Sequence, residues 1–135
     1  KKDYPHVENA SFEDLISKSD IISFHCKAPK DGKPMITKEH YKKMKPTAYI
    51  INAARGNIVD EKDLHEALNE NLIAGAAVDV FSKEPAKENI LFNNPKVVLT
   101  PHIAASTTEA SIVVAEMVAN QLSDFLLKGV KINTV

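Results

Sequence analysis

Apolar and polar positions alternate in blocks along this chain. Between the apolar runs, helical spacing returns, with Ser11, Thr37 and Asp60 standing where helix caps are expected. Lys45-Pro46 and Asn71 are expected to end the second and third of these helices. Strands joined by helices in this order predict an α/β fold with a doubly wound parallel sheet, whose strands are typically buried. The strand-like runs are residues 21–26, 48–54, 73–78 and 97–100.

A last, longer helix is predicted near the end of the chain. Ser106 and Glu109 form a capping box that opens it, and Gly129 can end it at the C′ position. Its apolar arc is wider than that of a surface helix, so we expect it to be covered from two sides. The second cover would be a partner subunit or a domain outside this sequence.

The composition disfavours several classes of partner. With 17 basic and 18 acidic side chains the net charge is −1, so no global field favours nucleic acid or an anionic membrane. The longest apolar stretches fall short of a membrane span, and residues 1–5 lack the apolar core of a signal peptide. The only cysteine, Cys26, cannot form an internal disulfide and is expected to be a buried thiol. We therefore expect a soluble, cytoplasmic protein, and the histidine spacing predicts no metal site.

The glycines indicate which part of a fold this chain represents. A length of 135 residues suffices for one domain with its own core. The four glycines, however, form no Gly-x-Gly-x-x-Gly turn that would hold a pyrophosphate at a helix N-terminus. If the fold binds a dinucleotide, we expect its phosphate-binding half to lie outside this sequence.

Polar residues stand at or just after the carboxyl ends of three predicted strands. Arg55, Asp79 and His102 hold these positions. Open parallel sheets bind ligands beyond these ends, so we expect the three side chains to share one crevice. A guanidinium there would bind a carboxylate through two parallel hydrogen bonds. A buried Asp79 would need a donor, for which a ligand amide is one candidate.

Glu84 lies in an irregular segment between the third and fourth strands. A carboxylate against the His102 imidazole would favour the imidazolium and fix the ring tautomer, as an acid/base histidine requires. Each candidate also has a purely structural alternative. These are a surface charge for Arg55, a turn cap for Asp79, a solvated loop carboxylate for Glu84 and a structural role for His102.

Three blocks of this sequence resemble the signature blocks of NAD-dependent D-2-hydroxyacid dehydrogenases. They are residues 50–60, 75–85 and 99–103, and the match covers nearly the whole chain, in order and with family-like spacing. Residues 104–110 are most similar to the D-3-phosphoglycerate dehydrogenases of that family. The resemblance implies a Rossmann-like fold, with residues 1–128 the second half of its NAD-binding domain and residues 129–135 an exit segment toward a substrate domain.

The resemblance also implies roles for individual residues. Arg55 would bind the substrate carboxylate and polarise the C2 carbonyl. Glu84 would pair with His102, and His102 would exchange a proton with the C2 oxygen while a hydride moves to or from nicotinamide. Asp79 would hold the nicotinamide carboxamide. The other positions expected to line NAD are Cys26, Ala53, Ala54, Arg55, His102, Ile103, Ala104 and Ala105.

The chain departs from the family pattern at two places. His25-Cys26-Lys27 stands where the family usually has His-x-Pro, which predicts a differently placed loop. Ala104 and Ala105 replace common glycines, which would narrow the nicotinamide pocket.

The function implied by the resemblance is hydride transfer between NAD and a small 2-hydroxy or 2-oxo acid. The first reading is 3-phosphoglycerate oxidation in serine biosynthesis. Glyoxylate, hydroxypyruvate or D-lactate as substrate, and an NAD-sensing corepressor of the same fold, remain open. At full length we expect a homo-oligomer, without nucleic-acid or membrane partners. The chain alone is expected to be inactive and to bind NAD weakly, because it lacks a pyrophosphate site.

Overall fold

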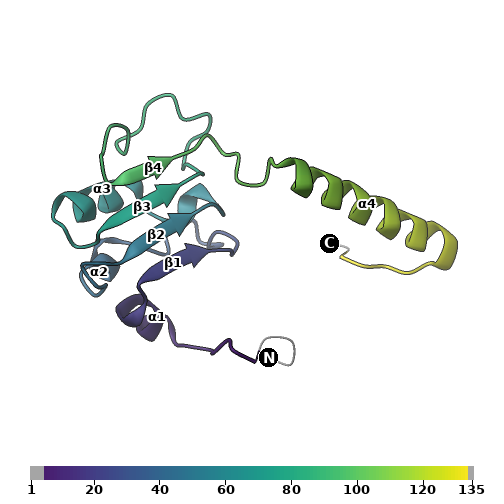
Figure 1. Cartoon of the computed structure of the whole chain (residues 1–135), viewed down its shortest axis with the longest axis horizontal. Coiled ribbons are helices and arrows are strands. Elements are labelled where there is room, and N and C mark those ends of the chain that lie inside the picture. Colours follow the sequence, from purple (N-terminus) through teal and green to yellow (C-terminus); the bar gives the residue numbers. More distant parts are fainter. Residues whose placement is uncertain (1–4, 134–135) are drawn as a thin grey trace. The chain divides into compact units, whose positions relative to one another are not determined.

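The computed structural model describes residues 5–133, which divide after His102 into two compact units (Figure 1). The first unit holds a parallel sheet with its helices, and the second holds one long helix. The elements of the first unit are α1 (Phe12–Lys18), β1 (Ile21–Phe24), α2 (Lys38–Tyr41), β2 (Tyr49–Asn52), the 3-10 helix η1 (Gly56–Ile58), α3 (Glu61–Asn69), β3 (Gly75–Val78) and β4 (Val97–Leu99).

The four strands form one sheet in the order β1-β2-β3-β4, and every neighbouring pair is parallel. The predicted α/β fold with a parallel sheet is therefore confirmed. Each strand is shorter than its apolar run, because the residues at the ends of the runs turn into the connecting loops. Asp79, for example, directly follows β3, as predicted.

Side-chain caps begin the helices of the first unit at the predicted residues. The Ser11 hydroxyl and the Asp60 carboxylate each accept the N–H three residues later, at 3.1 Å and 2.9 Å. Thr37 begins α2, and its N–H donates to Nδ1 of His40 at 3.1 Å. An imidazole thus takes the reciprocal place that Glu or Gln usually fills in a capping box. The helix is shorter than predicted and ends at Tyr41.

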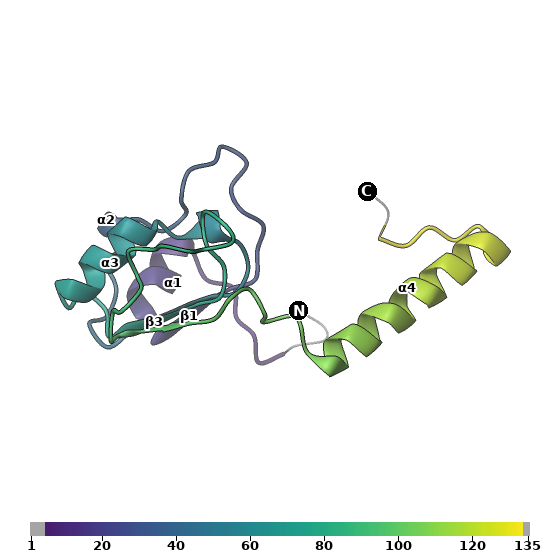
Figure 2. The same ribbon diagram turned by 90° about the horizontal axis from the view of Figure 1, so that it is seen from above.

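One face of the sheet carries α2 and α3, which lie side by side (Figure 2). Ile22 and Ile50 point to this face and are buried in the core. On the opposite face Ile21, Tyr49 and Val98 are 61%, 51% and 67% exposed. The expectation of buried strands therefore holds for one face of the sheet and not for the other, within the described residues. The successive right-handed crossovers step across the sheet in one direction, so their helices fall on the same side.

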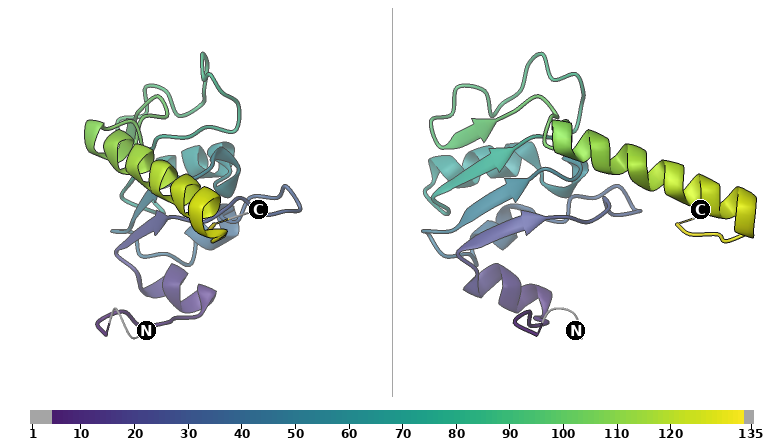
Figure 3. Two further views of the ribbon diagram at one scale, coloured as in Figure 1. Left: turned by 90° about the vertical axis from the view of Figure 1, so that its right-hand side faces the viewer. Right: turned by 45° about the vertical axis from the view of Figure 1, so that its right-hand side comes forward.

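The second unit is built on α4 (Thr108–Lys128), a single uninterrupted helix (Figure 3). Its cap is Thr107, whose hydroxyl accepts the Ala110 N–H at 3.1 Å, one residue later than the predicted Ser106. Either hydroxyl suits a cap, and the backbone decides which one reaches the free N–H groups. Gly129 ends the helix in the left-handed region, with φ of 67°, as predicted.

The side chains of α4 are largely apolar and exposed. With 21 residues, the helix is long and apolar enough to cross a membrane by length and composition. The uninterrupted apolar runs of the sequence did not reveal this property of the helix, because a helix can be apolar on average without such a run. One helix of this kind is weak evidence of a membrane span, since core helices of soluble proteins share the property. That α4 is covered from two sides stays a prediction.

Candidate active site at the carboxyl edge of the sheet

The carboxyl ends of the four strands lie level with one another. The Asp79 N–H donates to the Asn52 carbonyl at 2.9 Å, and the Thr100 N–H donates to the Val78 carbonyl at 3.1 Å. The ladder therefore continues one residue past β3 and β4, which fixes the backbone of both polar residues. The last residues of the strands, aligned by register, are Phe24, Asn52, Val78 and Leu99.

Asn52 shapes the turn that presents Arg55. Its buried amide donates to the Arg55 carbonyl at 3.0 Å, and its Oδ1 accepts the Ala54 N–H at 3.3 Å. The Arg55 side chain is exposed, and its Nη1 donates to the Ala54 carbonyl at 2.7 Å. Sequence reasoning missed this role of Asn52. The sequence offered one signal for this role: Asn52 is an amide inside an otherwise apolar run, and a buried amide must find hydrogen-bond partners within the protein.

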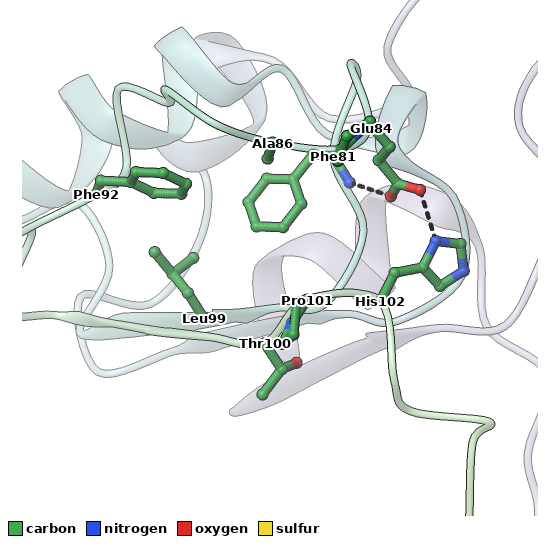
Figure 4. Close-up of a pocket in the computed structure, with 9 residues that line it drawn as sticks. Phe81, Glu84, Ala86, Phe92, Leu99, Thr100, Pro101 and His102 are labelled. Atoms are coloured by element: carbon green, nitrogen blue, oxygen red, sulfur yellow. Dashed lines mark hydrogen bonds and ion pairs between the residues drawn. The ribbon is translucent and has the colours of Figure 1, made fainter.

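Glu84 and His102 form the predicted pair (Figure 4). Nδ1 of His102 donates to Oε2 of Glu84 at 2.6 Å, a short distance typical of charge-assisted bonds. The other carboxylate oxygen accepts the Phe81 N–H at 2.9 Å. Because Nδ1 carries the proton that faces Glu84, Nε2 on the other side of the ring is left to exchange a proton with a ligand. The pair thus has the tautomer that an acid/base histidine needs.

His102 also has an unusual backbone conformation. Its φ of 57° lies in the left-handed region, which residues other than glycine rarely adopt. Such positions cost free energy and occur preferentially at functional sites. Its side chain remains 52% exposed, so a ligand can reach the ring.

The surroundings of Glu84 keep its carboxylate ionised. The Phe81 N–H, and after it the His102 ring, lower the pKa of Glu84 below its ordinary range, and these effects exceed the opposing effect of burial. Since the folded pKa is lowered, this interaction stabilises the folded protein above the pKa of the unfolded chain. That stabilisation is lost as the pH falls through the folded pKa of Glu84.

Asp79 is held by a residue of the next strand end. Its carboxylate is 5% exposed, and its Oδ1 accepts a hydrogen bond from the Thr100 hydroxyl. The donor expected for a buried Asp79 is therefore present within the chain, in Thr100. Sequence reasoning missed Thr100, which a hydroxyl in the last position of a strand-like run could have indicated.

Arg55, Glu84 and His102 line one pocket of about 210 Å³, so the expectation that Arg55 and His102 share one crevice is confirmed. Asp79 is not among the residues that line it. A larger, mostly apolar pocket of about 560 Å³ lies between the segment that carries Glu84 and the end of β4 (Figure 4). Both pockets include Phe81, Glu84 and His102 in their walls, so the carboxylate–imidazole pair borders each of them. The remaining residues of the smaller pocket are Ala28, Gly56, Asn57 and Val80.

Gly56 packs directly against the segment that carries Glu84. A Cβ here would lie 2.0 Å from the Phe81 carbonyl oxygen and 2.6 Å from the Ser82 nitrogen, so backbone atoms would have to move. Because the Phe81 N–H holds Glu84, we expect Gly56→Ala to disturb the pair and to destabilise the full-length protein by about 1–3 kcal/mol, measured by urea unfolding.

The matched control for this prediction is Gly32→Ala. No atom lies within 4 Å of a Cβ at Gly32, although its φ is 71°, so the substitution adds backbone strain without a clash. We expect Gly32→Ala to leave activity intact and Gly56→Ala to lower it. Equal activity of the two variants would refute the proposed contact effect.

The other expected cofactor positions fall into two groups. Cys26, Ala53 and Ala54 follow the ends of β1 and β2, at the edge that carries the pockets. Cys26 is exposed, so the expectation of a buried thiol is wrong, because the chain leaves the core after Phe24. The remaining positions, Ile103, Ala104 and Ala105, belong to the second unit.

Among residues 5–133 the structure shows no group of histidine, cysteine and carboxylate side chains that could hold a metal ion.

The loop after β1 contributes Ala28 to the pocket of Arg55. This residue lies in the loop where the sequence departs from the family pattern, and sequence reasoning gave it no role.

Comparison with known proteins agrees with this geometry. Residues 1–104 match the family described as D-isomer specific 2-hydroxyacid dehydrogenase, NAD binding domain. The chain belongs to this family. It is 46% identical over 128 residues to a glyoxylate reductase of Thermofilum pendens. The aligned region covers 93% of this chain and 37% of that protein. The chain is 42% identical over 119 residues to the D-3-phosphoglycerate dehydrogenase of Bacillus subtilis, covering 88% of this chain and 23% of that protein.

The fold agrees as well. A crystal structure of a glyoxylate reductase from Paecilomyes thermophila superposes with a TM-score of 0.80 at 34% identity, over 91% of this chain and 38% of that one. The Rossmann-like assignment and NAD as the cofactor of this dehydrogenase family are therefore confirmed. The chain spans about a third or less of the curated relatives it matches.

Proposed function

We propose that this chain is the catalytic-edge portion of the NAD-binding domain of a D-2-hydroxyacid dehydrogenase, and that Arg55, Glu84 and His102 are its catalytic residues. The observation that carries the proposal is the shared pocket, whose walls include Arg55 together with an imidazole held by a carboxylate. Anion binding and proton transfer are the two tasks that oxidation of a 2-hydroxy acid sets for the protein. The chemistry of these side chains meets both.

In this proposal Arg55 binds and orients the substrate. Its guanidinium offers the planar fork of N–H donors that matches a carboxylate, and a donor near C2 would also polarise the carbonyl. The buried Asn52 amide holds the backbone of the turn, so the side chain starts from a fixed position. Bound in this way, the substrate would present its C2 oxygen to the ring of His102.

His102 would move the proton that accompanies the hydride. During oxidation Nε2 accepts the hydroxyl proton as the hydrogen on C2 leaves with its electron pair, and during reduction the imidazolium returns the proton to the carbonyl oxygen. Glu84 stabilises the imidazolium form and keeps the ring in place, and its lowered pKa keeps it charged through this cycle. NAD, when bound, supplies the acceptor or donor of the hydride.

The residues at the strand ends have the chemistry to bind the nicotinamide end of NAD. Asp79 presents a carboxylate oriented by Thr100, and carboxylates accept hydrogen bonds from amide N–H groups such as those of a carboxamide. The small side chains of Ala53 and Ala54 allow a ring to approach the sheet edge. The cofactor contacts that we propose for this chain are completed by Cys26, Arg55, His102, Ile103, Ala104 and Ala105.

The substrate that we propose first is 3-phosphoglycerate, in serine biosynthesis, on the strength of residues 104–110. Reduction of glyoxylate or hydroxypyruvate is the second candidate, favoured by the 46% identity to a glyoxylate reductase. D-lactate is a third. We further propose a cytoplasmic homo-oligomer without nucleic-acid or membrane partners at full length.

The test is a substrate panel on the full-length protein with NADH. We expect oxidation of NADH with 3-phosphohydroxypyruvate at a kcat/KM at least about tenfold above that with hydroxypyruvate, glyoxylate or pyruvate, since a bound phosphate adds charge-assisted hydrogen bonds. Preference for glyoxylate would transfer the proposal to the second candidate. Turnover of none of these acids, together with retained NADH binding, would favour the NAD-sensing corepressor instead.

A further inference from the structure

Segment 81–89, which carries Glu84, has no regular secondary structure, so its shape depends on individual contacts. Glu61, the first residue of α3, supplies two of them. Its Oε1 accepts the Ser82 N–H at 2.7 Å, and its Oε2 accepts the Asn89 side-chain amide at 2.8 Å. One carboxylate thus fastens both ends of the segment to the helix.

The two attachment points connect to the catalytic pair and to the core. The Phe81 N–H, one residue before Ser82, donates to Glu84 at 2.9 Å. At the other end, Oδ1 of Asn89 accepts the N–H of Leu91, which is fully buried. Because Oδ1 of Asn89 already accepts the hydrogen bond from Leu91, the side-chain amide is oriented with its NH₂ group toward Glu61.

We propose that Glu61 is a positioning residue, which holds segment 81–89 so that Glu84 meets Nδ1 of His102. The inference rests on the proposed function of that pair and adds a residue that lines neither of the two pockets beside it. A displacement of about 1 Å in a catalytic group can lower rates by about 100-fold, so the fastening of this segment matters.

A competing explanation is that Glu61 only stabilises α3, because an acid in the first turn favours the helix dipole. A purely structural role would change stability but not the titration of Glu84. The two explanations therefore differ in a readout on the resting enzyme. The pKa of Glu84 is lowered mainly by the Phe81 N–H, which is the group next to the point that Glu61 holds.

The experiment uses the full-length enzyme and three variants at this contact. Glu61→Ala removes both bonds. Glu61→Gln keeps one acceptor but turns the other end into a donor that faces the donor amide of Asn89. Combining Glu61→Gln with Asn89→Asp restores the bond with reversed polarity, since the carboxylate introduced at position 89 can accept from the new amide and still accept the N–H of Leu91.

We expect Glu61→Ala to lower kcat by about 10- to 100-fold with little change in KM, and Glu61→Gln to lower it less. Glutamate-selective ¹³C NMR should show the Glu84 pKa rising toward its ordinary range in both, with Glu84→Gln used to assign the signal. The double variant should recover kcat and titration. Glu66→Gln, on the same helix but paired with Lys38 at 3.0 Å, is the matched control.

The outcomes separate this inference from the proposed function. If Glu61→Gln matches Glu66→Gln in both kcat and Glu84 titration, or if the double variant recovers neither, the positioning role is wrong, whether or not Glu61→Ala folds. If His102→Ala retains normal turnover, the proposed function fails instead. The Glu84 titration then still reports whether Glu61 positions the segment.

Discussion

Replacing His102 by alanine in the full-length enzyme is expected to lower kcat by about 100- to 10,000-fold, because a positioned acid/base group contributes this much to a proton transfer. The Glu84–His102 bond and the exposed far side of the ring place His102 where such a group must be. Steady-state kinetics with the preferred 2-oxo acid, together with NADH binding by fluorescence titration, measure the effect. Cofactor affinity should change little, since the imidazole acts on the substrate oxygen.

His65→Ala is the control for this experiment. His65 lies on α3, and its Nε2 contacts the Asn69 side chain at 2.9 Å, outside the pocket of Arg55. It should retain wild-type turnover. The kcat of Glu84→Gln should lie between those of His102→Ala and His65→Ala, because an amide can occupy the site of the carboxylate without stabilising the imidazolium. Normal kcat in His102→Ala would rule out its assigned role.

Replacing Arg55 by lysine is expected to lower kcat/KM by about 10- to 100-fold. An ammonium cannot make the two parallel bonds of a guanidinium, and a hydrogen bond to a charged group contributes about 1.5–3 kcal/mol. Arg55 is the only arginine in the sequence, and every other basic residue is lysine. The effect should appear in KM for the 2-oxo acid and in kcat, with NADH affinity preserved.

Chemical rescue tests the same role in a different way. Adding guanidinium to Arg55→Ala should restore part of the activity, whereas methylammonium at the same concentration should restore less, because it lacks the planar fork of donors. Equal rescue by both ions would show that Arg55 contributes only charge. No defect in either Arg55 variant would remove the residue from the catalytic set.

Local sequence patterns were sufficient to predict the order and type of most helices and strands. The apolar runs at β1 to β4 predicted parallel strands, and the caps at Ser11 and Asp60 marked helix starts correctly. These features depend on neighbours within a few residues, so the sequence contains them directly. The strand-end rule of parallel sheets placed Arg55 and His102 at one edge by the same reasoning.

Contacts between segments that are distant in the sequence could not be predicted from the sequence. Glu61 reaches Ser82 and Asn89, and Thr100 reaches Asp79, across separations that no local pattern encodes. The Glu84–His102 pairing was suggested by the chemistry of the two side chains and implied by the family resemblance, but no local pattern predicted it, since a single acid in an irregular loop carries no periodic signal. The uncovered sheet face likewise follows from the handedness of successive crossovers. The sequence by itself determined the strands, the caps and the chemistry available at the sheet edge. The tertiary structure alone decided which side chains hold that chemistry in place, because hydrogen-bond partners are selected by proximity after folding.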